Sequence, residues 1–240
     1  MCLSGIKNIV FMGDLACTPF LEANKTVLGK ILEIETDLFV ILGDISFLGE
    51  KEEFEEVIEF CNQRVTTPIF SLRGNHDAEG FSQFLGLATY ALILDTFVVL
   101  ALDNAMGVFE KESLAFTQEV LNKYPEKRFL ITFHVPPPTD LLAACMKREE
   151  WKKLTAILDE YRESIECILT GHIHGFQEYY LDGYRIFISG GGGAMLYDLE
   201  KDTLKSHHAI KATFKDDATV EMNVISVSDK TCIIRKESNG

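Results

Sequence analysis

The chain has 240 residues and a formal net charge of −14, because 23 Lys and Arg residues stand against 37 Asp and Glu residues. A hydrophobic content of 47% and a charged content of 25% are ordinary for a globular protein and exclude disordered and collagen-like chains. The length suits one domain, and we expect residues 1–240 to form it. The acidic balance repels phosphate backbones and therefore disfavours general binding to nucleic acid.

The apolar segments are too short to cross a membrane, since such a helix needs roughly 18 consecutive apolar residues. The longest apolar run, Leu92 to Leu102, is interrupted by Asp95 and is typical of two strands. The stretch from Met1 to Phe11 lacks the long apolar region and cleavage site of a signal peptide. We therefore expect a cytoplasmic protein that does not contact a membrane.

The cysteines are scattered along the chain and form no C-x-x-C pair. Neither a disulfide framework nor a cysteine zinc site is predicted. The cysteines are Cys2, Cys17, Cys61, Cys145, Cys167 and Cys232.

The first third of the chain alternates buried strands with helices. Apolar runs at residues 6–12, 37–42 and 68–72 predict strands. Residues 19–34 and 50–63 predict the helices between them, and in the second helix apolar residues recur at spacings of three and four. This β-α-β-α-β order implies a parallel sheet covered by helices.

The middle of the chain continues with a hairpin and further alternation of helix and strand. The predicted strands cover residues 88–94, 96–102, 128–133 and 167–170, and the predicted helices cover residues 111–123 and 146–162. From Phe176 onward the pattern is of strands alone. We expect residues 176–236 to provide mostly the strands of a second, antiparallel sheet.

Polar side chains follow five of the predicted strands: Asp14, Asp44, Asn75-His76-Asp77, His134, and His172 with His174. Because the carboxyl ends of parallel strands share one edge of a sheet, we expect these residues to converge on one site. Each cluster alone is typical of turns, caps or a core histidine. Four of the six histidines nevertheless belong to this set, which indicates one shared functional site. Carboxylate, amide and imidazole ligands suit hard-to-borderline divalent metals and are the ligands of two-metal hydrolases.

The order and spacing of these residues resemble the calcineurin-like metallophosphoesterase superfamily. Its motifs are D-x-H, G-D, G-N-H-D/E, a lone H and G-H-x-H, and the match spans residues 6–193 with four motifs of the five intact. The resemblance implies an α/β fold, a four-layer αββα sandwich of two mixed β-sheets flanked by helices. The glycine run at 190–193 also resembles bacterial members, although by itself it is typical of a flexible turn.

The resemblance also implies two divalent ions, which we call the first and the second ion; Mn²⁺, Fe²⁺ or Fe³⁺, and Zn²⁺ are the expected metals. Asp44 would bridge them. The expected ligands of the first ion are Asp14, Asp44 and His174. The expected ligands of the second ion are Asp44, Asn75, His134 and His172.

His76 is implied to be catalytic rather than a ligand. It would stand beside the substrate and stabilise or protonate the leaving oxygen, with Asp77 orienting its ring. Asn75 and Arg73 would lie beside the substrate, and Arg73 would either contact a phosphate oxygen or form a surface ion pair.

One motif departs from the family pattern. The D-x-H motif reads Asp14-Leu15-Ala16, so a histidine ligand of the first ion is replaced by alanine. The purple-acid-phosphatase branch instead places a tyrosine where this chain has Phe47. We therefore expect the first ion to be bound more weakly than the second.

The residues and the resemblance together predict a metal-dependent hydrolase of small phosphoric esters, either monoesters or diesters. Two divalent ions bring about +4 of charge to a site that an acidic protein would otherwise make repulsive to phosphate. One alternative is a scaffold that keeps this fold without catalysis, which Ala16 favours and the converging histidines disfavour. The other is a nuclease of the same superfamily, disfavoured because the densest basic patch, at 147–153, also contains two glutamates. The pair His207-His208 would lie either near the site or on a solvated strand, and of the two we expect the solvated strand.

Overall fold

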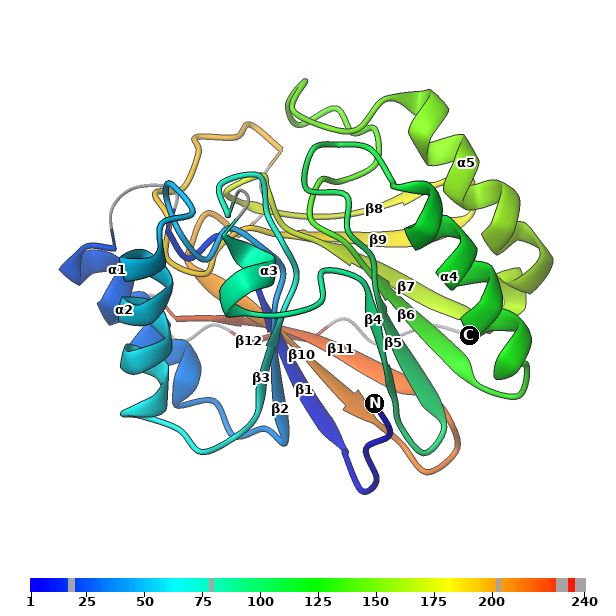
Figure 1. Ribbon diagram of the computed structural model, residues 1–240, viewed down its shortest axis with the longest axis horizontal. Coiled ribbons are helices and arrows are strands. Elements are labelled where there is room, and N and C mark those ends of the chain that lie inside the picture. The colour runs from blue at the N-terminus through cyan, green and yellow to red at the C-terminus, as the bar shows by residue number, and fades with distance from the viewer. Residues whose placement is uncertain (17–19, 78–79, 202–203, 228–232, 236–240) are drawn as a thin grey trace.

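The computed structural model describes residues 1–16, 20–77, 80–201, 204–227 and 233–235, and in them two six-stranded sheets are formed. Helices α1 (Glu22–Leu32) and α2 (Lys51–Asn62) cover the outer face of one sheet. Helices α4 (Lys111–Lys123) and α5 (Arg148–Leu158) cover the outer face of the other, as Figure 1 shows. The predicted four-layer αββα sandwich of two mixed sheets is confirmed.

The first sheet has the strand order β12-β11-β10-β1-β2-β3. Strands β1, β2 and β3 are parallel, and β10 lies antiparallel to β1. The strand bounds are Asn8–Met12 for β1, Leu38–Ile41 for β2, Ile69–Ser71 for β3, His208–Phe214 for β10, Val220–Ser226 for β11 and Ile233–Arg235 for β12.

The second sheet has the strand order β4-β5-β6-β7-β9-β8. Strands β5, β6, β7 and β9 are parallel, and the edge strands β4 and β8 are antiparallel to their neighbours. The bounds are Tyr90–Ile93 for β4, Phe97–Ala101 for β5, Arg128–Thr132 for β6, Ile165–Thr170 for β7, Phe176–Leu181 for β8 and Tyr184–Ser189 for β9. A 3₁₀ segment, Asp159–Ser164, follows α5, and the short helix α3, Phe81–Phe84, was not predicted from the sequence.

The core between the sheets is built from alternate strand residues. Ile9 and Phe11 of β1 and Val40 of β2 pack there with residues of β5, β6 and β7. Their chain neighbours Val10 and Phe39 face the other way and pack with α1 and α2. This period of two, with both faces apolar, is why the strands read as continuous apolar runs in the sequence.

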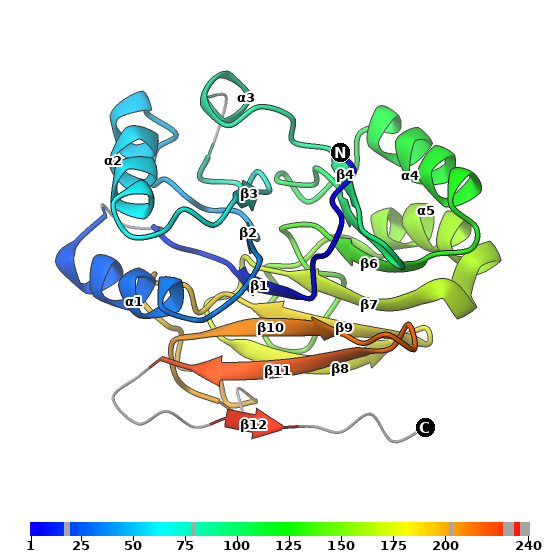
Figure 2. The ribbon, with the colours of Figure 1, turned by 90° about the horizontal axis from the view of Figure 1, so that it is seen from below.

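The prediction that residues 176–236 form a separate antiparallel sheet is wrong. Strands β8 and β9 extend the sheet of β4–β7, whereas β10, β11 and β12 extend the sheet of β1–β3, as Figure 2 shows. Strand β10 pairs with β1 over the register from Asn8↔Thr213 to Phe11↔Ile210. Alternation along a strand shows which faces are buried but not which edge the strand joins, and these C-terminal strands cover edges of both sheets.

The cysteines of the described residues are free thiols, in line with the expectation of no disulfide framework; they are Cys2, Cys61, Cys145 and Cys167. Burial raises the pKa of the Cys167 thiol to about 12, so it behaves as a core residue. Cys17 and Cys232 lie outside the described residues. Within the described ranges no helix is both long and apolar enough to span a bilayer.

Candidate metal centre

The polar residues singled out by the sequence meet where the two sheets adjoin. Asp14, Asp44 and Asn75 follow β1, β2 and β3 of the first sheet, whereas His134 and His172 follow β6 and β7 of the second. Asp14, Asp44 and His134 are at most 1% exposed. The convergence was predicted, but it was expected along one parallel sheet. The site is instead shared by two sheets whose parallel strands end at the same place.

Three of the expected ligands have a strained backbone. Asp14, Asp44 and His172 have φ angles of 61°, 54° and 70°, in the left-handed region that non-glycine residues rarely occupy. Each such residue costs roughly 1–3 kcal/mol, so its surroundings must hold it there. The amide of His172 donates to both carboxylate oxygens of Asp14 at 3.0 and 2.9 Å, and the amide of His76 donates to Asp44 Oδ1 at 2.9 Å.

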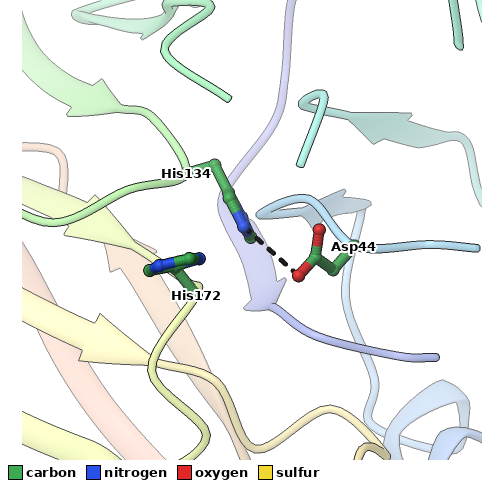
Figure 3. Close-up of side chains that lie close together, drawn as sticks. All are labelled: Asp44, His134 and His172. Atoms are coloured by element: carbon green, nitrogen blue, oxygen red, sulfur yellow. Dashed lines mark ion pairs between the residues drawn. The ribbon is translucent and has the colours of Figure 1, made fainter. Parts of the chain in front are cut away.

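The four expected ligands of the second ion lie together. The ligand atoms of Asp44, His134 and His172 are all within 4.8 Å of one another. Figure 3 shows the His134 ring directed at the Asp44 carboxylate, with Nε2 3.3 Å from Oδ2. Asn75 Oδ1 lies 3.1 Å from His134 Nε2 and 2.7 Å from His172 Nδ1. Oxygen and nitrogen donors from four separate loops therefore point at one small volume.

Two histidines are oriented by main-chain carbonyls. His134 Nδ1 lies 2.8 Å from the carbonyl of Leu42, and His174 Nδ1 lies 2.8 Å from the carbonyl of Met195. A carbonyl only accepts, so each Nδ1 carries the proton and each Nε2 is left for the site. His174 Nε2 is 3.7 Å from Asp14 Oδ1, the pairing expected for the first ion. This arrangement is characteristic of metal-binding histidines.

The two carboxylates have opposite electrostatic surroundings. Burial raises the pKa of Asp14 well above its ordinary value, and the charge of Asp44 adds to the increase. Burial also acts on Asp44, but the adjacent His134 charge and hydrogen bond outweigh it and hold the pKa of Asp44 below its usual range. For His134, burial is likewise outweighed by Asp44, which raises the pKa of the imidazole to about 9. A positive charge beside these residues, in addition to that of His134, would stabilise the ionised forms of Asp14 and Asp44.

His172 and His174 are neutral near pH 7. Burial and the charge of His134 lower the pKa of His172 to about 3, and burial lowers the pKa of His174. Both imidazoles therefore offer lone pairs, which is the form that binds metal.

Gly74 permits the close packing of these motifs, because a Cβ there would lie 2.1 Å from Asp44 Oδ1. The donor set fits divalent cations.

His76 is held differently from the prediction. Its Nδ1 is 2.9 Å from the carbonyl of Phe47, and its ring stacks on the Phe47 ring at a centroid distance of 5.8 Å. The Asp77 carboxylate is instead fully engaged with the amides of Ile45, Ser46 and Gly74 and with the Ser46 hydroxyl. The expectation that Asp77 orients the His76 ring is therefore wrong. Asp77 ties the loop after β3 to the loop after β2, because a buried carboxylate needs several donors.

Arg73 forms the ion pair that the sequence left as one alternative. Its Nε and its NH2 group lie 3.2 and 2.8 Å from the two carboxylate oxygens of Asp103, and its side chain is 27% exposed. Such a bidentate pair fixes the guanidinium in one plane.

Ala16 is a core residue in the structure. It is 1% exposed and packs in the apolar cluster formed by the first sheet with α1 and α2. Its amide lies 3.2 Å from the carbonyl of Asp44. The position that holds a histidine in the D-x-H motif is therefore part of the apolar core here.

The glycine run at 190–193 and the pair His207-His208 are structural parts of the site's surroundings. The Gly192 amide donates to the carbonyl of Gly13, and a Cβ at Gly191 would lie 2.2 Å from His208 Nδ1. His208, the first residue of β10, is fully buried and His207 is half-buried, so the expectation of a solvated strand is wrong for His208. The run is a tightly packed loop rather than a flexible turn.

Two asparagines near the site were missed in the sequence. Asn104 follows β5 and Asn24 lies in α1, and both are buried. Asn104 has the same position at a strand end as the predicted ligands, which was the available signal. Asn24 has none, because a helical asparagine is usually exposed.

Comparison with known proteins identifies the family of the chain. The sequence pattern of the calcineurin-like phosphoesterases matches residues 7–176. The chain belongs to this family. Among proteins of known structure, the purple acid phosphatase PPD1 of yellow lupin has a TM-score of 0.76 at 13% identity, covering 98% of this chain and 55% of that one. A dimetal phosphatase of Danio rerio has a TM-score of 0.67 at 12% identity, covering 96% and 99%. At such identities the likeness concerns the fold.

Two sequence relatives in this family have the names of phosphodiesterases. A probable cyclic nucleotide phosphodiesterase of Ruthia magnifica is 26% identical over 198 residues, which cover 78% of this chain and 82% of that protein. A probable glycerophosphodiester phosphodiesterase, GpdQ, of Arcobacter nitrofigilis is 26% identical over 182 residues, which cover 64% of each chain. The chain thus spans less than two thirds of the length of that second relative.

Proposed function

We propose that this protein is a metal-dependent hydrolase of phosphoric esters and that its substrates are small phosphodiesters. The observation that carries the proposal is the convergence of Asp44, His134 and His172, with Asn75 between the two imidazoles. A binding scaffold has no need of converging imidazoles and a carboxylate. The names of the two relatives support a diester as the substrate.

The metal ions belong to the same proposal. The second ion would be held by Asp44, Asn75, His134 and His172, and the first by Asp14, Asp44 and His174. When bound, two divalent ions supply the positive charge that draws a phosphate ester to an acidic protein and activates water for in-line attack. The protein's own contribution is a rigid set of metal-ligand atoms. Hydrogen bonds from main-chain amides to Asp14 and Asp44 fix these carboxylates before an ion or a substrate binds.

We assign the proton transfer to His76. With Nδ1 donating to the carbonyl of Phe47, the proton for the leaving oxygen would come from Nε2 of the doubly protonated ring, which keeps its Nδ1 proton afterwards. The stacked Phe47 ring limits rotation of the imidazole. Phe47 therefore takes the orienting role that Asp77 was expected to have.

The ion pair of Arg73 favours diesters over monoesters. Asp103 pairs with Nε and NH2 of the guanidinium and offsets its charge, so Arg73 adds little net positive charge for a doubly charged monoester. A diester carries one negative charge and needs less compensation.

The test is hydrolysis of bis-p-nitrophenyl phosphate and p-nitrophenyl phosphate by protein reconstituted with Mn²⁺, together with metal analysis. We expect two ions per chain and a higher kcat/KM for the diester. His172→Ala and His134→Ala should weaken metal binding by more than about 100-fold, the upper end of the effect of outer-shell partners, and abolish turnover. The control is Tyr180→Ala, an exposed side chain of β8 outside the ligand set. Wild-type turnover by either ligand variant would overturn the assignment, and a wild type without bound metal would favour a scaffold.

A further inference from the structure

Two buried asparagines are placed alike relative to the two expected ions. Asn24 is 3% exposed and Asn104 is 1% exposed, and each side chain makes three hydrogen bonds to main-chain groups. Neither side chain is among the expected ligands. A buried amide that satisfies main-chain groups costs stability when removed, so its partners show what it holds in place.

Asn104 holds the loop of the second ion's ligands. Its Oδ1 accepts from the amides of His134 at 2.8 Å and Val135 at 3.0 Å, and its Nδ2 donates to the carbonyl of Val135 at 2.7 Å. The main chain at His134 and Val135 is therefore held by three hydrogen bonds from one side chain.

The residue before Asn104 reaches the other sheet. Asp103 holds Arg73, which directly precedes Gly74 and the expected ligand Asn75. Asn75 Oδ1 and His134 Nε2 then meet at 3.1 Å. Asp103 and Asn104, which are consecutive in one loop, thus hold the segments of two expected ligands of the second ion. These ligands are Asn75 of the first sheet and His134 of the second.

Asn24 has the corresponding place beside the first ion. Its Nδ2 donates to the carbonyls of Leu15 at 2.9 Å and Gly193 at 3.1 Å, and its Oδ1 accepts from the amide of Leu21 at 3.1 Å. Leu15 follows the ligand Asp14. Gly193 leads to Ala194, whose amide donates to the carbonyl of Asp14, and then to Met195, whose carbonyl orients His174. Asn24 therefore joins the two loops that position Asp14 and His174.

We propose that Asn24 and Asn104 are positioning residues, one for each metal ion: Asn24 sets the affinity of the first ion and Asn104 that of the second. The inference rests on the two-ion centre of the proposed function. Neither asparagine touches an ion; each acts by holding the main chain that carries the ligands, as outer-shell partners do.

The experiment is calorimetric titration of the metal-free protein with Mn²⁺, in which His172→Ala identifies the binding step of the second ion and His174→Ala that of the first. We expect Asn104→Ala to lower the affinity for the second ion by about 10- to 100-fold. Asn24→Ala should lower the affinity for the first ion by a similar factor. Each variant serves as the control for the other, because both lose three hydrogen bonds of a buried amide. Thermal unfolding of the metal-free variants measures the structural cost separately.

Aspartate substitutions carry the test if an alanine variant does not fold. Asn104→Asp keeps both acceptor bonds to the amides of His134 and Val135, so the affinity of the second ion should fall by less than about tenfold. Asn24→Asp loses both donor bonds, to Leu15 and Gly193, and should weaken the first ion as Asn24→Ala does. Unchanged affinities in all foldable variants, or equal weakening of both steps by each variant, would overturn the inference. A wild type that binds no Mn²⁺ would overturn the metal centre itself and the inference with it.

Discussion

At the scale of single residues, the site is ordered by main-chain groups as much as by its side chains. The carbonyls of Leu42, Phe47 and Met195 each set the direction of one imidazole. Because a carbonyl accepts and never donates, Nδ1 of each ring carries a proton, and His134 and His174 present Nε2 to Asp44 and Asp14. The motif residues supply the chemistry, and residues outside the motifs decide which ring nitrogen performs it.

The role of His76 is testable through the leaving group. We expect His76→Ala to retain its metal ions, since His76 is not a ligand, and to lower kcat by about 10²- to 10⁴-fold, the usual effect of losing a general acid. The loss should be smaller for p-nitrophenolate than for an alkoxide, because a good leaving group needs less protonation. Equal losses for both leaving groups would instead indicate that His76 binds the phosphate.

Ala16 tests whether the first ion is open to a further ligand. Its side chain packs among apolar neighbours, so Ala16→His should overpack the cluster and lower the free energy of unfolding by about 1–3 kcal/mol. We expect no gain in affinity for the first ion in a calorimetric titration. Tighter binding with an unchanged Tm would show that the position does face the ion.

At the scale of elements, the loops after the strands position the site and the strands anchor the loops. The glycine run after β9 links the loop after β1 to the start of β10: the Gly192 amide donates to the carbonyl of Gly13, the amide of the next residue after the run, Ala194, donates to the carbonyl of Asp14, and Gly191 packs on His208. The absence of side chains in this run allows the close contacts.

The glycine run can be tested with a single methyl group. A Cβ at Gly191 would lie 2.2 Å from His208 Nδ1, so Gly191→Ala should cost about 1–3 kcal/mol of stability and weaken the first ion. Gly29→Ala in α1 is the matched control, because its nearest contacts are at 3.8 Å and alanine favours a helix by roughly 1 kcal/mol. Chemical denaturation of both variants measures the difference. Similar stability for both variants would contradict the packing argument.

At the scale of the whole molecule, the centre joins the two sheets. Asp14, Asp44 and Asn75 come from the first sheet and His134, His172 and His174 from the second. Bound ions would therefore link the two sheets through the same atoms, in addition to the apolar core between them.

Metal binding should accordingly stabilise the fold. At a concentration 100 times Kd, each Mn²⁺ ion that binds only the folded state contributes about 2.7 kcal/mol. For a domain of this size that corresponds to an increase in Tm of roughly 5–10 °C per ion. Differential scanning calorimetry with Mn²⁺ and then with excess EDTA checks the effect and its reversal. A Tm that does not respond to either addition would contradict the proposed centre.

The sequence by itself determined the strands, most of the helices and the polar residues that meet at the site. Buried parallel strands are continuous apolar runs, and the end of a run gives the place of a ligand within one to three residues, as for Asp14 and Asn75. Only the tertiary structure decided which edges β8–β12 join, that Phe47 rather than Asp77 orients His76, and that Asn24 and Asn104 hold the ligand loops. These features depend on contacts between residues far apart in the chain, such as Asn24 with Gly193, and the pattern along a strand or helix specifies which face is buried but not what lies against it.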